Sequence, residues 1–287
     1  MLKVFEWKVG DRWLSNVDHT LIMGVLNVTP DSFSDGGAFL RPDAAVSRGL
    51  MMVAQGADIV DIGGESTRPG ASAVTIDEEL VRTIPVVEEL AAGGVVVSID
   101  TTKPEIAEAA VEAGALIIND ISGLGTQGMD RVAAETQAGL VLMHMKGVPE
   151  TMQEVPVYGD VVGEVEAYLD GAVAAALDAG VGPSAIAIDP GIGFGKTLRH
   201  NLRLLAATSR FSEKGYPLLI GVSRKRFLGD LASIPIPKDR DAVSASLGAH
   251  LAAEGCGILR VHDVKATRAS LRVADAMLRS MPKGISG

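Results

Sequence analysis

Three short polar side chains each follow directly on an apolar run of the chain. A continuous apolar run is typical of a parallel strand that is buried on both faces. In a barrel of such strands the C-terminal ends meet at one rim, so side chains at these ends would converge on one ligand. Two carboxylates and one amide suit a ligand rich in N–H donors, such as the edge of a guanidine-like heterocycle. The three residues are Asp100, Asn119 and Asp189.

The alternative is that these residues cap the helices that follow them, as Asp and Asn often do. For any one of the three residues, helix capping explains its position as well as ligand binding does. The occurrence of all three at strand ends favours a shared binding site.

Basic residues gather near the same predicted rim, although the whole chain is acidic. The net charge is −10 and the isoelectric point is near 5.0, which disfavours a nucleic-acid partner. An acidic chain with a basic pocket is typical of an enzyme for a phosphorylated or carboxylated small molecule. The basic residues are Arg68, Arg224, Lys225, Arg260 and His262.

Two of these basic segments suit an anion. Ser223 stands where a strand gives way to a helix, where it can cap the helix and where free N–H groups favour negative charge. Arg260 and His262 alternate on one strand, so both side chains point to the same side. Two such groups suit a phosphate or a diphosphate. No spacing of His, Cys and Asp encodes a zinc site.

The glycine-rich segment that begins at Pro190 resembles nucleotide-binding motifs only superficially. A P-loop would need glycine where Pro190 stands, and a dinucleotide fingerprint would need glycine at Lys196. The glycines more simply let the backbone turn close to a ligand that Asp189 holds. Phe194, in the middle of the segment, would pack against a ring of that ligand or in the core.

Strand and helix patterns alternate along the chain in eight pairs. Repeated pairs of this kind predict a parallel sheet, and eight of them in 287 residues favour one (β/α)8 TIM barrel, with an open sheet as the alternative. The expected strands are 20–28, 58–63, 95–100, 116–119, 140–144, 185–189, 218–222 and 258–262. The expected helices are 42–55, 76–92, one opened by Thr102, 129–137, 160–179, 200–211, 225–231, 241–253 and 265–281.

Three regions are expected along the chain. Residues 1–19 read as a β-hairpin that covers the barrel floor, 20–281 as the barrel and 282–287 as a frayed tail. Two loops, after the first and second strands, are longer than usual connections and read as lids, or else as ordered surface excursions.

Composition limits the setting in which the chain works. Hydrophobic residues make up 47%, which is enough for a sizeable core. No apolar run approaches the roughly 20 residues that span a bilayer, so we expect no membrane partner. The single cysteine, Cys256, forms no internal disulfide, which favours a reducing cytoplasm.

Seven segments, in order, resemble the dihydropteroate synthase family over residues from about 20 to 280. The two most specific are Ile22-Met-Gly-Val-Leu-Asn-Val-Thr-Pro-Asp-Ser-Phe-Ser-Asp-Gly-Gly37 and Ile59-Val-Asp-Ile-Gly-Gly-Glu-Ser-Thr-Arg-Pro-Gly70. Shorter matches begin at Ser98, Asn119, Asp189, Gly221 and Arg260. The family joins p-aminobenzoate to a 6-hydroxymethyl-dihydropterin diphosphate and releases diphosphate.

The resemblance implies a role for each matching residue. Pterin recognition would fall to Asp189, Asn119, Asp100 and Lys225, with Met143 also in the substrate site. The diphosphate would be held by Arg260 and His262 and by Mg²⁺ on Asn27. The p-aminobenzoate pocket would be closed by Thr67, Arg68, Pro69, Phe33 and Asp35, and lined by Ser223 and Phe194. A homodimer is implied as well.

Two other functions remain as alternatives. A pterin-dependent methyltransferase shares the barrel and the pterin triad by resemblance, but it does not need the two long loop motifs. A catalytically silent pterin-binding relative is the other alternative, because a fold alone does not prove activity.

Overall fold

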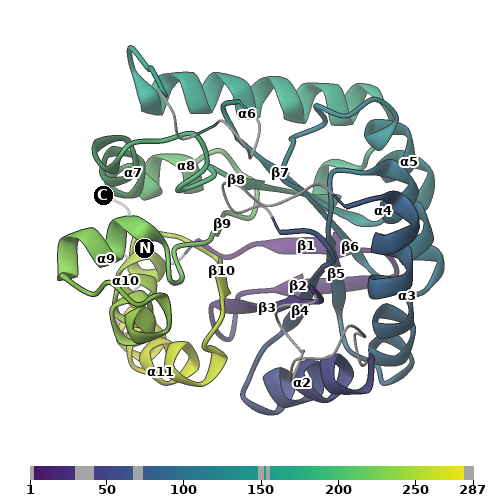
Figure 1. Ribbon diagram of the computed structural model, residues 1–287. Helices are drawn as coiled ribbons and strands as arrows, with labels where there is room; N and C mark the ends of the chain where they lie inside the picture. The colour runs from purple at the N-terminus through teal and green to yellow at the C-terminus, as the bar shows by residue number, and fades with distance from the viewer. Residues whose placement is uncertain (1–2, 30–41, 67–73, 148–151, 153–155, 281–287) are drawn as a thin grey trace.

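Eight parallel strands form a closed barrel in the computed structural model, which describes residues 3–29, 42–66, 74–147, 152 and 156–280 (Figure 1). The hydrogen-bonded order is β8-β7-β6-β5-β4-β3-β10-β9, and a bridge between Ile188 and Leu218 joins the two ends of this order. The predicted TIM barrel is confirmed, and the open sheet is wrong. The strands are β3 (Leu21–Asn27), β4 (Ile59–Gly63), β5 (Val97–Asp100), β6 (Ile117–Asp120), β7 (Gly139–Met143), β8 (Ile186–Asp189), β9 (Leu219–Ile220) and β10 (Ile258–Val261).

Helices surround the barrel as an outer layer (Figure 1). The helices are α2 (Pro42–Ala54), α3 (Ile76–Ala92), α4 (Pro104–Glu112), α5 (Met129–Thr136), α6 (Val161–Asp178), α7 (Leu198–Ala206), α8 (Thr208–Ser212), α9 (Arg226–Ala232), α10 (Asp241–Ala253) and α11 (Val264–Ser280), with short 3-10 turns η1 (Pro183–Ala185) and η2 (Pro237–Arg240). No helix in the described part of the chain is both long and apolar enough to cross a membrane.

Two helix predictions are wrong in detail. The helix expected over 200–211 is split at Ala207 into α7 and α8, and the side chain of Thr208 donates to the carbonyl of Leu205 at the break. The expected cap Thr102 does not cap α4, which has Lys103 at its N-cap without a side-chain bond. Instead, the hydroxyl of the preceding Thr101 accepts a hydrogen bond from the Lys103 N–H, just before the helix begins.

The N-terminal hairpin packs against the N-terminal ends of the barrel strands. Its strands are β1 (Glu6–Val9) and β2 (Arg12–Ser15), and the fully buried Trp7 donates from Nε1 to the Ala185 carbonyl at 2.8 Å. Val9 lies so close to Gly139 that a Cβ there would be 2.6 Å from its Cγ1. The hairpin thus contacts the beginning of β7 and the segment that leads into β8.

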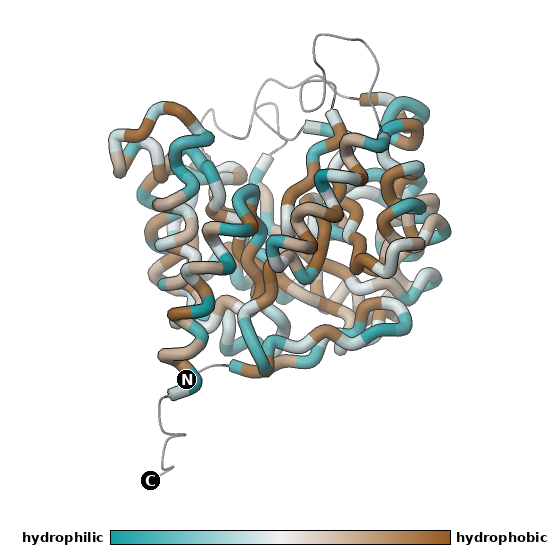
Figure 2. Tube along the Cα trace, turned by 90° about the horizontal axis from the view of Figure 1, so that it is seen from below, coloured by the Kyte–Doolittle hydropathy of each residue, from teal (hydrophilic) through white to brown (hydrophobic). Residues whose placement is uncertain are grey.

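Apolar side chains fill two layers. One layer packs the strands against the surrounding helices, and the other fills the lower barrel above Trp7, with Met23, Ile117 and Val141 among its members. Figure 2 shows hydrophobic residues running through the middle of the molecule. Above this lower layer the buried interior turns polar, with Asp61, Ser98, Asn119 and Asp189, so the polar interior lies toward the C-terminal strand ends.

Candidate active site

The strand register brings the expected polar side chains together at the C-terminal rim. Asp100 of β5 is opposite Asn119 of β6, and Met143 of β7 is opposite Asp189 of β8. Register partners in a parallel sheet point to the same face. The four residues therefore occupy adjacent strands of one wall.

Arg260 of β10 reaches across the barrel to this wall. Its Nε donates to Asp61 at 2.6 Å and its Nη2 to Asp100 at 2.5 Å. Burial alone would lower the pKa of Arg260, but the charges of Asp61 and Asp100 outweigh it and raise that pKa. Arg260 is therefore a fixed cation, already paired with two carboxylates.

Asp61 is a site residue that we did not predict from the sequence. It is fully buried on β4, and its Oδ2 accepts from both Arg260 and the Nδ2 of Asn119, the latter at 3.1 Å. The available signal was a carboxylate in the middle of the apolar strand Ile59–Gly63. A charged residue in a fully buried strand is rare unless it is paired.

The bond to Asp61 also sets the direction of the Asn119 carboxamide. An ionised carboxylate only accepts hydrogen bonds, so the NH₂ group must face Asp61 and the amide oxygen faces away as an acceptor. The capping alternative is wrong for all three strand-end residues. The N-cap residues of α4, α5 and α7 are Lys103, Gly128 and Thr197.

Hydrogen-bond acceptors in this cluster are left over. Among the described residues, Oδ1 of Asp61, Oδ1 of Asp100 and Oγ of Ser98 are buried without a partner. Burial raises the pKa of Asp100 to about 7, against the opposing effect of Arg260. Spare acceptors of this kind suit a ligand that brings N–H donors.

Asp189 lies beside a second cation. Its Oδ1 accepts from the Gly191 N–H at 2.7 Å. Burial raises its pKa, and the charge of Lys225 acts in the opposite direction. Burial likewise lowers the pKa of Lys225 to about 8. The Lys225 amine lies 4.6 Å from the centre of the Phe194 ring and donates to the Ile192 carbonyl, so Phe194 and Lys225 form one surface beside Asp189.

Ser223 and His262 are bonded to each other. The Ser223 hydroxyl lies 3.1 Å from the His262 N–H, which donates to it, and 3.0 Å from the His262 Nδ1. The prediction that Ser223 caps a helix is wrong, because Lys225 is the N-cap of α9. Arg224, between Ser223 and Lys225, has a positive φ of 60°. Its guanidinium forms a bidentate salt bridge with Asp241, with both contacts at 2.7 Å.

The residues predicted on the two long loops lie outside the part of the chain that the structure describes. They are Phe33, Asp35, Thr67, Arg68 and Pro69. Lys103, which we did not predict to take part, bonds to both described ends of the second loop. Lys103 donates to Glu65 at 2.7 Å, to Glu79 at 2.6 Å and to the Val74 carbonyl at 2.8 Å.

Asn27 ends β3 at the same rim, and its Oδ1 lies 3.7 Å from where a Cβ on Gly63 would stand. The same position lies 3.7 Å from Oδ2 of Asp100. The described ranges hold no group of three or more His, Cys, Asp or Glu side chains that could bind a metal.

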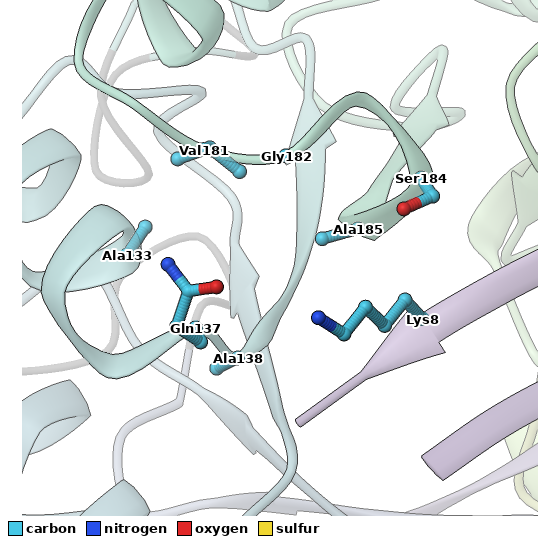
Figure 3. A pocket seen from close by; sticks show the side chains of 8 residues that line it. All are labelled: Lys8, Ala133, Gln137, Ala138, Val181, Gly182, Ser184 and Ala185. Atoms are coloured by element: carbon cyan, nitrogen blue, oxygen red, sulfur yellow. The ribbon is translucent and has the colours of Figure 1, made fainter. Parts of the chain in front are cut away.

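A separate small hollow lies at the opposite end of the barrel (Figure 3). Its volume is about 50 Å³, and it lies beside Lys8 of β1 and the residues that precede β7 and β8. None of the predicted active-site residues that the structure describes lines this hollow. The rim remains the candidate active site.

Known proteins resemble the chain over nearly all of its length. The profile of a family described as "Pterin binding enzyme" matches residues 23–262. Dihydropteroate synthase of Escherichia coli K12 is 46% identical over 92% of this chain and 93% of its own, and that of Mycobacterium leprae is 48% identical over 91% and 95%. The chain belongs to the dihydropteroate synthase family.

Solved structures of dihydropteroate synthases share the fold. The Xanthomonas albilineans enzyme with 4-aminobenzoic acid has a TM-score of 0.91 and 44% identity, and the match covers 98% of this chain and 100% of that one. The same enzyme with 7,8-dihydropteroate has a TM-score of 0.87 and 42% identity over 96% and 100%. The resemblance that we drew from the sequence motifs is confirmed.

Proposed function

We propose that this chain joins p-aminobenzoate to 6-hydroxymethyl-7,8-dihydropterin diphosphate, giving 7,8-dihydropteroate and diphosphate. The observation that carries the proposal is the convergence of Asp100, Asn119 and Asp189 at one rim beside Lys225 and Arg260. Family membership supports the same reaction over that of a pterin-dependent methyltransferase, since the relatives named above are synthases.

The pterin would bind to the acceptors of the rim. Asp189 has one carboxylate oxygen beyond the one that Gly191 uses, and Asn119 turns its amide oxygen away from Asp61. Asp100 and these two would accept from the pterin N–H groups. Lys225 would donate to the pterin and Met143 would contact it, and Phe194 would line the p-aminobenzoate pocket.

The diphosphate would bind on the β10 side of the rim. Arg260 and His262 supply donors there, and the pairing of Arg260 with Asp61 and Asp100 fixes the guanidinium before substrate arrives. A donor group that is already in place stabilises developing charge without reorganising.

Mg²⁺ would bind the diphosphate together with Asn27. One amide oxygen fits the ion, because Mg²⁺ usually keeps several waters and binds through one or two protein groups plus substrate phosphates. When bound, the ion would neutralise charge on the departing diphosphate. The second substrate would lie under the two long loops, with Thr67, Arg68, Pro69 and Asp35, beside Ser223.

The reaction would be a dissociative displacement without a covalent enzyme intermediate. The bond between the pterin methylene carbon and diphosphate oxygen breaks, a bond to the aniline nitrogen forms, and that nitrogen loses one proton. Positive charge on the pterin is favoured by the nearby carboxylate of Asp189. A mass measurement that trapped pterin on the protein would contradict this route.

Two further properties belong to the same proposal. The chain would act as a homodimer, for which the exposed apolar residues Val273 and Met277 on α11 offer a surface. It would work in the cytoplasm, where the buried free thiol of Cys256 stays reduced. We also keep the division into hairpin 1–19, barrel 20–281 and tail 282–287 as a proposal.

A diphosphate-release assay tests the function. The purified protein, both substrates and Mg²⁺ should release diphosphate only when p-aminobenzoate is present. Asp189→Asn should abolish this release, because an amide offers one acceptor where a carboxylate offers two. Release that does not depend on p-aminobenzoate would count against the synthase. No release at all would also count against it and would favour a silent pterin-binding protein.

A further inference from the structure

A buried lysine underlies the pterin side of the rim. Lys196 is only 2% exposed, although a lysine is rarely buried without partners. Four acceptors lie within 3.2 Å of its Nζ: the Gly191 carbonyl at 2.8 Å, the Phe194 carbonyl at 2.9 Å, and Nδ1 and the carbonyl of His144 at 2.9 and 3.2 Å. Burial lowers the pKa of Lys196 well below its usual value, and the three short contacts stabilise the charged amine against this effect.

His144 serves this lysine as an acceptor. Burial and the charge of Lys196 lower the pKa of His144 to about 3, so the ring is neutral at ordinary pH. With the Lys196 amine as the donor to Nδ1, the ring proton is on Nε2. Lys196 therefore joins the end of β7 to the loop after β8 through hydrogen bonds that it alone donates.

The loop that Lys196 holds has no regular structure of its own. Gly191 and Gly195 have φ values of +67° and +61°, and a Cβ on them would lie 1.9 Å from the His144 carbonyl and 2.2 Å from that of Lys146. Backbone groups in such a loop need partners from elsewhere. Lys196 supplies two of them, and the Tyr158 hydroxyl supplies another to Gly195 at 3.0 Å.

The same loop carries much of the proposed pterin site. The Gly191 N–H fixes one oxygen of Asp189, the Ile192 carbonyl accepts from Lys225, and the Phe194 ring faces the Lys225 amine. Without the hydrogen bonds from Lys196, the loop would no longer hold these groups in their present orientations. From the sequence, Lys196 is only the residue that breaks a dinucleotide-binding motif.

We propose that Lys196 is a positioning residue for pterin binding, which fixes the 190–195 loop so that Asp189 and Lys225 face the ligand together. The proposal rests on the proposed function. Lys196 is not itself a ligand group, because its amine is buried and its partners are groups of this chain. Because the loop holds Asp189 and Lys225 through direct hydrogen bonds and reaches the second substrate only through Phe194, the effect should be much larger on pterin affinity than on the use of p-aminobenzoate.

The test compares Lys196→Met, Lys196→Gln and a control, Lys214→Met. Lys214 is a lysine on the floor side of the barrel whose amine pairs with Asp170 at 2.7 Å. Affinity for the pterin diphosphate is measured by calorimetry without p-aminobenzoate, KM for p-aminobenzoate is measured at saturating pterin, and unfolding is followed in urea. Lys196→Met should lose pterin affinity at least tenfold and change that KM by less than threefold.

The other two variants sharpen the result. Lys196→Gln should lose less affinity, because its amide still offers two N–H groups, and Lys214→Met should match the unmodified chain. The pH below which pterin binding fails should also rise in Lys196→Met, because Lys196, Lys225 and Arg260 all act to lower the pKa of Asp189.

The other possible results would contradict the role of Lys196 or the function itself. Pterin affinity within twofold in a folded Lys196→Met variant would overturn the proposal. Equal losses for both substrates, or failure of both Lys196 variants to fold, would assign the residue a purely structural role and would also overturn it. An unmodified chain that binds no pterin would instead overturn the proposed function, so the two failures are distinguishable.

Discussion

Two arginine–carboxylate networks lie at opposite ends of the barrel and differ in how completely they are bonded. At the floor, Arg268 donates to the carbonyls of Gly56 and Thr20 and to Asp58 at 2.6 Å. Asp58 also accepts from the Ile22 N–H at 2.7 Å. At the rim, Arg260 donates to Asp61 and Asp100, and an oxygen of each carboxylate has no partner in the described part of the chain.

The fully bonded network at the floor stabilises the fold, and the incompletely bonded network at the rim suits ligand binding. The floor network ties β3 to α11 and closes the ring between the first and last elements of the barrel, with backbone carbonyls as partners. The rim network holds the like charges of Asp61 and Asp100 close together and leaves one oxygen of each without a hydrogen bond from the described residues. Such an arrangement contributes little to the stability of the fold. Natural proteins keep such arrangements mainly at functional sites. The floor should therefore respond to mutation in stability, and the rim in activity.

Arg260→Met should give the largest effect on activity. It removes the cation shared by Asp61 and Asp100 and a donor that we assign to the diphosphate, so kcat/KM should fall by about 100-fold or more. Steady-state assays of diphosphate release measure this loss. A variant that stayed folded and kept a tenth of the activity would remove Arg260 from the site.

Arg268→Met should show the opposite pattern. Its side chain is 10% exposed, and removal leaves Asp58 and two carbonyls short of donors. We expect a loss of about 3 kcal/mol in the free energy of unfolding, as for other broken buried pairs. Urea unfolding measures it, and kcat/KM of the folded fraction should stay within twofold. A large drop in kcat/KM at unchanged stability would erase the distinction between the two ends.

Asp61→Asn should act through protonation, with a smaller effect. Both of its hydrogen bonds fall on one oxygen, which an amide oxygen can replace. The charge of Asp61 raises the pKa of Asp100, so its loss should lower that pKa from about 7. The acid side of the pH–rate profile should move to lower pH, because Asp100 would ionise earlier.

The same substitution predicts a change in stability with pH. Asp100 holds its proton up to about pH 7 in the folded chain, against a reference value of 3.8. The folded state therefore binds more protons in this window, and stability falls as pH rises through it. In Asp61→Asn the fall should be shallower, and in the exposed control Asp170→Asn it should be unchanged. Identical curves for all three proteins would show that Asp61 and Asp100 are not coupled.

The sequence predicted the strand-end residues because an apolar run that ends in Asp or Asn is a local pattern. The pairing of Arg260 with Asp61 was not predictable in this way, because it joins residues 199 positions apart across the barrel. Lys196 was missed for the same reason, since its partner His144 lies on another strand. The break at Ala207 and the failed cap at Thr102 depend on single local bonds that compete with helix propensity.

Arg131→Ala should have the smallest effect and tests whether burial, not distance, separates strong pairs from weak ones. Arg131 and Glu135 lie 2.6 Å apart on α5, the same distance as Arg260 and Asp61, but their side chains are 57% and 59% exposed. Water screens an exposed pair, so the free energy of unfolding should change by no more than about 0.5 kcal/mol. A loss close to that of Arg268→Met would mean that short contacts matter wherever they lie, and the contrast between rim and floor would then need another cause.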